Sequence, residues 1–225
     1  MIERHRSPHV PRLDPGVTLL EVDDRATGAL HSLVLDHLLV DDGTAVWVDA
    51  RDEGTTRPLA RIAPNLRLLE RVAIARAFTP WQHQALLRDL GDSLPDGASL
   101  VVAPAFDWCY RSDDLAESEA ERLCSAAASL VADVAVREEI PVVLTRTAGT
   151  PFAAELLDVV DDVVRCEVTA FGPRFAGDDF ETLVYPHGDG TMQTTLAYWR
   201  QVLTTRHPAA ATGASPTEVS AGGAN

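Results

Sequence analysis

The amino-acid sequence predicts an α/β fold built on a mainly parallel sheet. Short apolar runs of strand type alternate with segments whose apolar residues recur at helical spacing, the order expected where helices connect parallel strands. Towards the end of the chain, segments that alternate apolar and polar residues are joined by turn-forming residues. This second pattern favours antiparallel strands at one edge of the sheet.

The first half of the chain begins with a strand at Val17–Val22 and a helix at Gly28–Val40, which Thr27 is expected to cap. A turn at Asp41-Asp42-Gly43 precedes a buried strand at Ala45–Val48. The next elements are a strand at Val72–Ala77, a helix at Pro80–Leu90 that starts with proline and stops at Gly91, and a strand at Leu100–Ala103.

The second half contains the longest helix, at Asp114–Glu139, with acidic residues crowding its start, where the helix dipole favours them. A short strand at Val142–Leu144 follows. The antiparallel strands are expected at Val163–Thr169, Glu181–Tyr185 and Thr191–Ala197.

Composition divides the chain into an arm, one domain and a tail. Residues 1–15 contain three prolines and no apolar period, and residues 206–225 are rich in Ala, Gly, Ser, Thr and Pro. We expect a flexible N-terminal arm at 1–15, a core domain at 16–205 and a disordered tail at 206–225.

The chain is acidic and contains no lysine. Its formal net charge is -15, and all 19 of its basic residues are arginine. Two explanations stay open: adaptation to a cytoplasm of high salt, where acidic groups keep a protein hydrated, or the bias of a GC-rich genome. Such a charge lacks the basic footprint of most nucleic-acid-binding proteins.

The three cysteines, Cys109, Cys124 and Cys166, form no C-x-x-C pair and indicate reduced thiols. The start of the chain is too polar for a signal peptide, and no stretch is apolar enough to span a membrane. We therefore expect a cytoplasmic protein.

Three motifs occur in a fixed order. Glu53-Gly54-Thr55-Thr56-Arg57-Pro58 follows the strand that ends in Asp49, then come Ala75-Arg76-Ala77-Phe78 and His83-Gln84. This order resembles the RecA-superfamily recombinases of the archaeal RadA type. The resemblance covers about residues 16–186 and implies a RecA-like P-loop NTPase core fold.

The resemblance places the phosphate loop after the first strand, in a degenerate form. Gly28 matches its second glycine, but Ala29 stands at the lysine and Leu30 at the hydroxyl residue that binds magnesium. Asp23 and Asp24 would bring like charge towards the phosphates. The candidate residues of this degenerate loop are Arg25, Thr27, Gly28, Ala29 and Leu30.

Other positions that the family uses for ATP chemistry also differ. Ala103-Pro104 stands where a Walker B aspartate is expected, and Thr145-Arg146-Thr147 stands in place of T-N-Q. Glu53 alone matches, at the position of the water-activating glutamate; it is either a retained general base or a turn residue beside Gly54. The resemblance therefore implies a pseudo-ATPase that needs no cofactor.

Other candidates carry weaker signals. The acidic pairs Asp23-Asp24, Asp41-Asp42, Asp161-Asp162 and Asp178-Asp179 are expected to be solvated. His31 and His37 do not share a helix face and suit a metal poorly, and Cys109 has no histidine at an informative spacing. The candidate partner-binding aromatics are Trp81, Tyr198 and Trp199, with core packing or base stacking as alternatives.

The resemblance, together with the lost site residues, implies a non-catalytic RecA/RadA-like accessory protein that binds a RadA-type recombinase or a paralogue in homologous recombination or DNA repair. Two alternatives stay open. One is an ATP- and magnesium-binding ATPase with an atypical phosphate loop that uses Arg25 and Glu53. The other is a module that binds single-stranded DNA without ATP.

Overall fold

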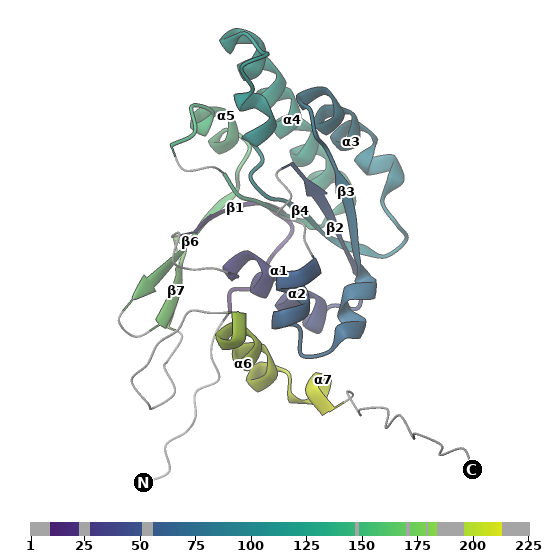
Figure 1. The fold of residues 1–225 in the computed structure, drawn as a ribbon, viewed down its shortest axis with the longest axis vertical. Helices are drawn as coiled ribbons and strands as arrows, with labels where there is room; N and C mark the ends of the chain where they lie inside the picture. Colours follow the sequence, from purple (N-terminus) through teal and green to yellow (C-terminus); the bar gives the residue numbers. More distant parts are fainter. Residues whose placement is uncertain are drawn as a thin grey trace, which may run out of the picture.

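The computed structural model describes residues 10–22, 28–50, 56–146, 149–169, 172–178, 180–183 and 196–212, which form one eight-stranded sheet with helices on both faces (Figure 1). The strands are β1 (Gly16–Val22), β2 (Thr44–Asp49), β3 (Val72–Arg76), β4 (Ala98–Ala103), β5 (Pro141–Leu144), β6 (Asp162–Thr169), β7 (Gly172–Ala176) and β8 (Glu181–Leu183). Their order in the sheet is β3-β2-β4-β5-β1-β6-β7-β8.

The first six strands in this order run parallel, and β7 and β8 continue the sheet antiparallel. The central strands β4 and β5 are apolar runs that are buried on both faces, as parallel strands covered by helices must be. The predicted α/β class, with a mainly parallel sheet and an antiparallel edge, is confirmed.

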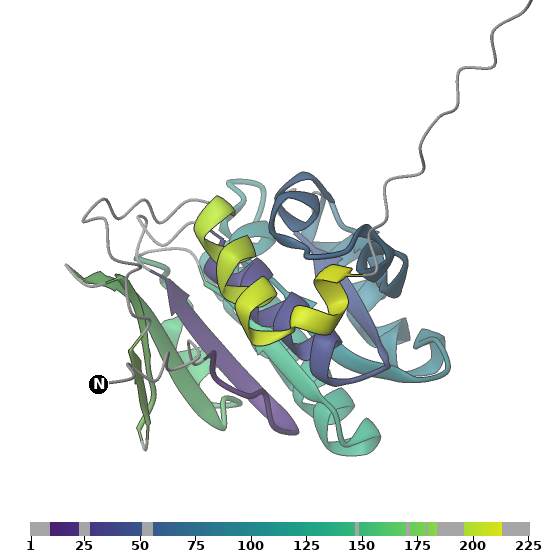
Figure 2. The same cartoon turned by 90° about the horizontal axis from the view of Figure 1, so that it is seen from below.

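One face of the sheet carries two layers of helix. The inner layer is α1 (Ala29–Val40), which is apolar on nearly all sides and has most of its residues buried. The outer layer consists of α2 (Thr56–Ile62) and α6 (Leu196–Arg206), which contact each other and α1. Figure 2 shows α6 lying along α1. A helix that is apolar all round must be covered all round, and this second layer does so.

The other face is covered by α3 (Pro80–Ser93), α4 (Glu117–Glu138) and α5 (Ala153–Leu157). Two of these three helices, α3 and α5, contact α4. Their buried residues form a second apolar core with the facing side chains of β1, β2, β4 and β5. Short 3₁₀ segments, η1 (Leu66–Arg71) and η2 (Trp108–Arg111), and a last helix, α7 (Pro208–Thr212), complete the described fold.

Three helix boundaries differ from the prediction. α1 begins at Ala29 with Gly28 at its N-cap, and not with Thr27 as expected. α3 continues through Gly91 to Ser93. Gly91 lies close to the guanidinium of Arg137, which would have to move if this residue had a β-carbon. The glycine therefore permits a close approach and does not end the helix. α4 begins at Glu117, three residues after Asp114, because Ser112 and Asp114 form a turn before it.

The antiparallel region differs from the prediction in its last member. β6 and β8 lie where strands were expected, and β7 pairs with both. The third expected strand, Thr191–Ala197, is wrong at its C-terminal end, because α6 begins at Leu196. Residues 191–195 lie outside the described residues.

Both ends of the described chain are held more firmly than composition predicted. Val10 and Leu13 of the expected arm are buried in the core. Residues 206–212 of the expected tail complete α6 and form α7, so the tail boundary at 206 was placed too early. Among the helices described, none is both long enough and apolar enough to cross a membrane.

Candidate functional site

The carboxyl ends of β1, β4 and β5 meet at one edge of the sheet, where the sequence places the nucleotide site. Ligands of open α/β sheets bind outside this edge. The structure describes Gly28, Ala29 and Leu30 of the predicted site. Arg25, Thr27 and Glu53 lie outside the described residues.

The start of α1 is part of the apolar core. Gly28 precedes the helix in a left-handed conformation, with φ of 91°. A β-carbon added there would lie 2.9–3.1 Å from side chains of Leu196, Trp199 and Ile62, so α2 and α6 pack directly against this glycine. Ala29 and Leu30 follow it and are themselves buried. At these positions the helix offers neither a cation for phosphate nor a hydroxyl for magnesium.

The end of β4 is a closed turn. Ala103 is buried, and Ala105 adopts a left-handed conformation with φ of 45°. The amide of Ala105 donates to Thr145 Oγ1 at 2.8 Å, and the amide of Phe106 donates to the carbonyl of Thr145 at 2.9 Å. Thr145 is thus committed to holding this turn, which carries no carboxylate at the position of the Walker B aspartate.

Arg146, the second residue after β5, is tied to the neighbouring strands. Its guanidinium pairs with Glu21 of β1, and the second oxygen of Glu21 accepts a hydrogen bond from Arg165 of β6 at 3.0 Å. One carboxylate therefore bridges two arginines across three adjacent strands. Arg146, for which the sequence resemblance predicted a place in a nucleotide-sensing segment, pairs with Glu21 and so helps to hold these strands together.

Exposed aromatic side chains gather at the other end of the same edge. Phe78, Trp81 and Trp108 are 81%, 54% and 41% exposed. They line a hollow of about 400 Å³ between the end of β3, the start of α3 and η2, which Arg111 also borders. We call Phe78, Trp81 and Trp108 the aromatic rim. Large apolar side chains that are exposed next to one another often mark a surface that binds another molecule.

Of the predicted partner-binding aromatics, Trp81 belongs to this rim, but Trp199 does not lie on the surface. Trp199 is fully buried in the core of the double-layered face, where its ring packs near Phe175 and Tyr198 at centroid distances of 5.7 and 5.4 Å. Tyr198 is partly buried beside it. Trp199 is therefore not exposed for docking, because the helix that carries it faces α1, while the role expected of Tyr198 stays a prediction.

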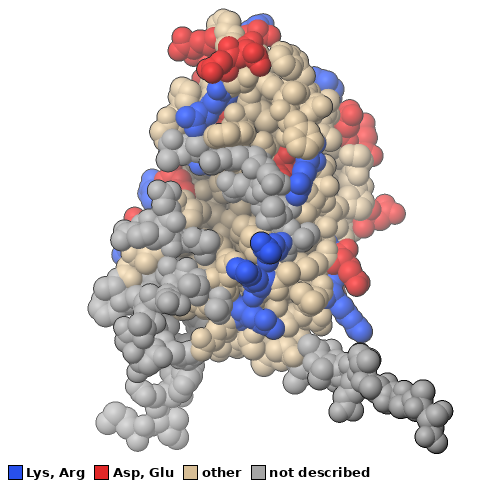
Figure 3. All heavy atoms as spheres, viewed as in Figure 1, with Lys and Arg blue, Asp and Glu red and all other residues tan. Residues whose placement is uncertain are grey.

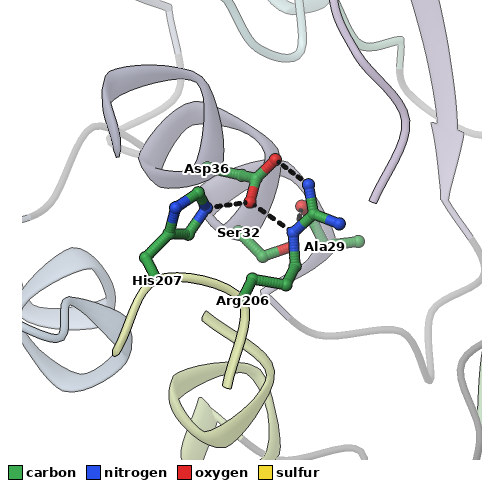
Figure 4. A network of polar contacts seen from close by, with 5 residues as sticks. All are labelled: Ala29, Ser32, Asp36, Arg206 and His207. Atoms are coloured by element: carbon green, nitrogen blue, oxygen red, sulfur yellow. Dashed lines mark hydrogen bonds and ion pairs between the residues drawn. The ribbon is translucent and has the colours of Figure 1, made fainter. Parts of the chain in front are cut away.

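A buried ionic network fixes the second layer to the first (Figure 4). Asp36 of α1 is 4% exposed. Its two oxygens accept hydrogen bonds from Nε and Nη2 of Arg206 at 2.7 and 2.9 Å, and His207 Nε2 donates to Oδ1 at 2.8 Å. Sequence reasoning missed this site, because Asp36 lies in an apolar helix and its partners lie in the segment assigned to the tail.

The thiol and histidine candidates are structural. Cys109 is buried, and desolvation, with a contribution from Asp49, raises the pKa of its thiol to about 11. His37 Nε2 lies 3.2 Å from Ser99 Oγ, and the ring of His31 packs 5.5 Å from that of Trp47. Across the described ranges, no three His, Cys, Asp or Glu side chains are placed to hold a metal ion.

A larger cleft, of about 790 Å³, lies at the opposite edge of the sheet, beside the start of β4 and the end of α1. Its walls include the segment at 10–15 and the acidic turn at Asp41 and Asp42. Its described lining includes none of the predicted nucleotide-site residues, so its size carries no argument for that chemistry.

Comparison with known proteins identifies no family. The chain matches no family model, and no curated protein matches it.

Proposed function

We propose that this chain is a non-catalytic protein with a RecA-like core that binds a RadA-type recombinase or a paralogue in homologous recombination or DNA repair. The strand order supports the RecA-like part. Only β5 separates β1 from β4, so a phosphate loop after β1 and a carboxylate after β4 would face the same nucleotide. The three motifs that resemble RadA lie between β1 and β4 in the sequence.

The described residues do not fit ATP and magnesium. Ala29 and Leu30 are buried at the start of α1, and the turn after β4 closes on Thr145. The proposal therefore gives the fold a binding role and assigns no step of ATP hydrolysis to it.

The observation that carries the binding role is the aromatic rim. Tryptophan is enriched among the residues that dominate protein–protein affinity. In an acidic chain with a filled core, Phe78 and Trp81 are left in solvent beside a hollow. A protein partner that buries these rings would gain the hydrophobic contribution that the monomer does not use.

Affinity capture from cells that express the protein tests this function. The tagged wild-type chain should retain a RecA-superfamily recombinase. The F78A/W81A variant should retain at least about tenfold less of this recombinase. The matched control is L66A/V136A, which removes two other exposed apolar side chains and should capture the recombinase as well as wild type does. Equal capture by all three proteins, or no recombinase with wild type, would refute the proposal.

A second measurement addresses ATP. The melting temperature of the purified chain should not change with ATP and magnesium at high potassium chloride. An increase that R25A abolishes would favour the ATPase alternative.

A further inference from the structure

The second helical layer is a basic surface on an acidic protein. α2, α6 and α7 contain no aspartate or glutamate, although the chain as a whole has 34 acidic residues. Arg57 and Arg61 of α2 and Arg200 of α6 are exposed. We call these three residues the arginine face. Figure 3 shows basic side chains gathered over α2 and the adjoining end of α6, with the visible acidic side chains elsewhere.

The fold directs these arginines outwards. Arg57 and Arg61 are one helical turn apart, on the side of α2 opposite to its buried residues Leu59 and Ile62. Arg200 follows Trp199, whose ring fills the core beneath. The contacts between α2, α6 and α1 therefore hold the two helices that carry these arginines in one layer.

Among the described residues, nothing binds the arginine face. In the part of the chain that the structure describes, no ion pair and no side-chain hydrogen bond engages Arg57, Arg61 or Arg200. Other arginines of this protein are committed: Arg146 and Arg165 bind Glu21, Arg174 binds two glutamates, and Arg206 binds Asp36. With almost two acidic residues for each arginine in the sequence, unpaired arginines that are grouped on one surface are unexpected.

From these contacts we infer that the arginine face binds an acidic segment of a partner protein, through aspartate and glutamate carboxylates. This inference rests on the proposed function only in taking the occupant to be a protein. Guanidinium groups bind carboxylates in a two-pronged geometry. α6 already contains such a contact about one and a half turns after Arg200, where Arg206 binds both oxygens of Asp36 (Figure 4).

A nucleic-acid backbone fits this surface less well. The formal charge of -15 repels a long polyanion. The aromatic residues of α6 do not provide a stacking platform for bases, since Trp199 is buried and Tyr198 partly so. A short carboxylate-rich segment experiences less of this repulsion and needs no stacking.

Fluorescence anisotropy with a labelled peptide of aspartate and glutamate tests the inference, at the lowest salt at which circular dichroism shows the chain folded. R57A/R61A/R200A should bind the peptide about tenfold more weakly than wild type. The matched control R88A/R122A/R137A removes three exposed arginines from α3 and α4. It loses the same charge and should bind the peptide nearly as wild type does, and binding should weaken as salt rises.

Three results would overturn the inference: no binding of the peptide by wild type, equal losses in both triple variants, or selective loss of labelled oligothymidylate binding without peptide binding. The last result would assign the face to nucleic acid. Peptide binding without recombinase capture would refute the proposed function alone. Recombinase capture that R57A/R61A/R200A leaves intact, with no peptide binding, would refute this inference alone.

Discussion

The two faces of the sheet are covered in different ways. On one face α1 is an inner helix, enclosed between the sheet and the layer of α2 and α6. On the other face α3, α4 and α5 form a single layer whose outer sides are exposed. The end of α1 that would hold phosphate in a RecA-like core is thus hydrophobic core here, while the exposed aromatic rings lie where β3 leads into α3.

Replacing two tryptophans, one on each face of the sheet, should give the largest difference in the free energy of unfolding. Trp199 is fully buried between α6 and α1, and Trp81 is more than half exposed at the start of α3. W199A should lower the free energy of unfolding by about 4 kcal/mol, because it removes a large core side chain and leaves a cavity. W81A should change it by less than about 0.5 kcal/mol.

Urea denaturation of the two variants beside wild type measures this difference. Similar losses in both would mean that Trp81 is also packed, and they would weaken the case for a docking rim. A small loss in W199A would mean that α6 does not cover α1 in solution.

Breaking the ionic network between the two helical layers should have the next largest effect on the free energy of unfolding. D36A leaves Arg206 and His207 without their carboxylate in a site where the side chain of Arg206 is 18% exposed. Removing one partner of a buried pair costs about 3 kcal/mol. D133A, on the exposed side of α4, is the matched control and should change the free energy of unfolding by less than about 0.5 kcal/mol.

The same denaturation curves test whether the network is ionic. Replacing both partners, in D36L/R206M, should recover part of the loss, because no unpaired charge is left buried. Equal stability of D36A and D133A would show that α6 is held by its apolar contacts alone.

The fold class was predictable from sequence because its signals are local. The apolar runs of β2, β4 and β5 and the helical spacing of α1 and α4 are properties of short segments, and they were placed correctly within a few residues. α2 and α6 were missed. α2 has only seven residues, and the apolar residues of α6 do not form a clear stripe along one side of the helix.

The site was less predictable, because its decisive contacts join residues far apart in the chain. Gly28 matched a motif by itself, but Leu196 and Trp199 lie about 170 residues later and pack against it. Asp36 meets Arg206 over a similar separation. The aromatic rim brings Phe78 and Trp81 near Trp108, a residue from another segment. Whether a side chain is exposed or buried at these positions depends on tertiary packing, which a short sequence motif does not reveal.

The single-layered face gives the smallest of the stability predictions, through a buried histidine at its centre. His83 of α3 is fully buried, with Nδ1 sharing a hydrogen bond with the Tyr110 hydroxyl at 2.8 Å and its ring against Phe106. Desolvation lowers its pKa from 6.5 to about 4. Between these two values the unfolded chain binds a proton that the folded chain does not, so stability falls as pH falls through this window.

The free energy of unfolding of wild type should therefore fall by about 2 kcal/mol more than that of H83Q between pH 7 and pH 5. Glutamine cannot take up this proton, so H83Q keeps the titration of every carboxylate and lacks only that of the imidazole. Urea denaturation of both proteins at several pH values gives the difference directly. Parallel curves would show that water reaches His83 in the folded protein.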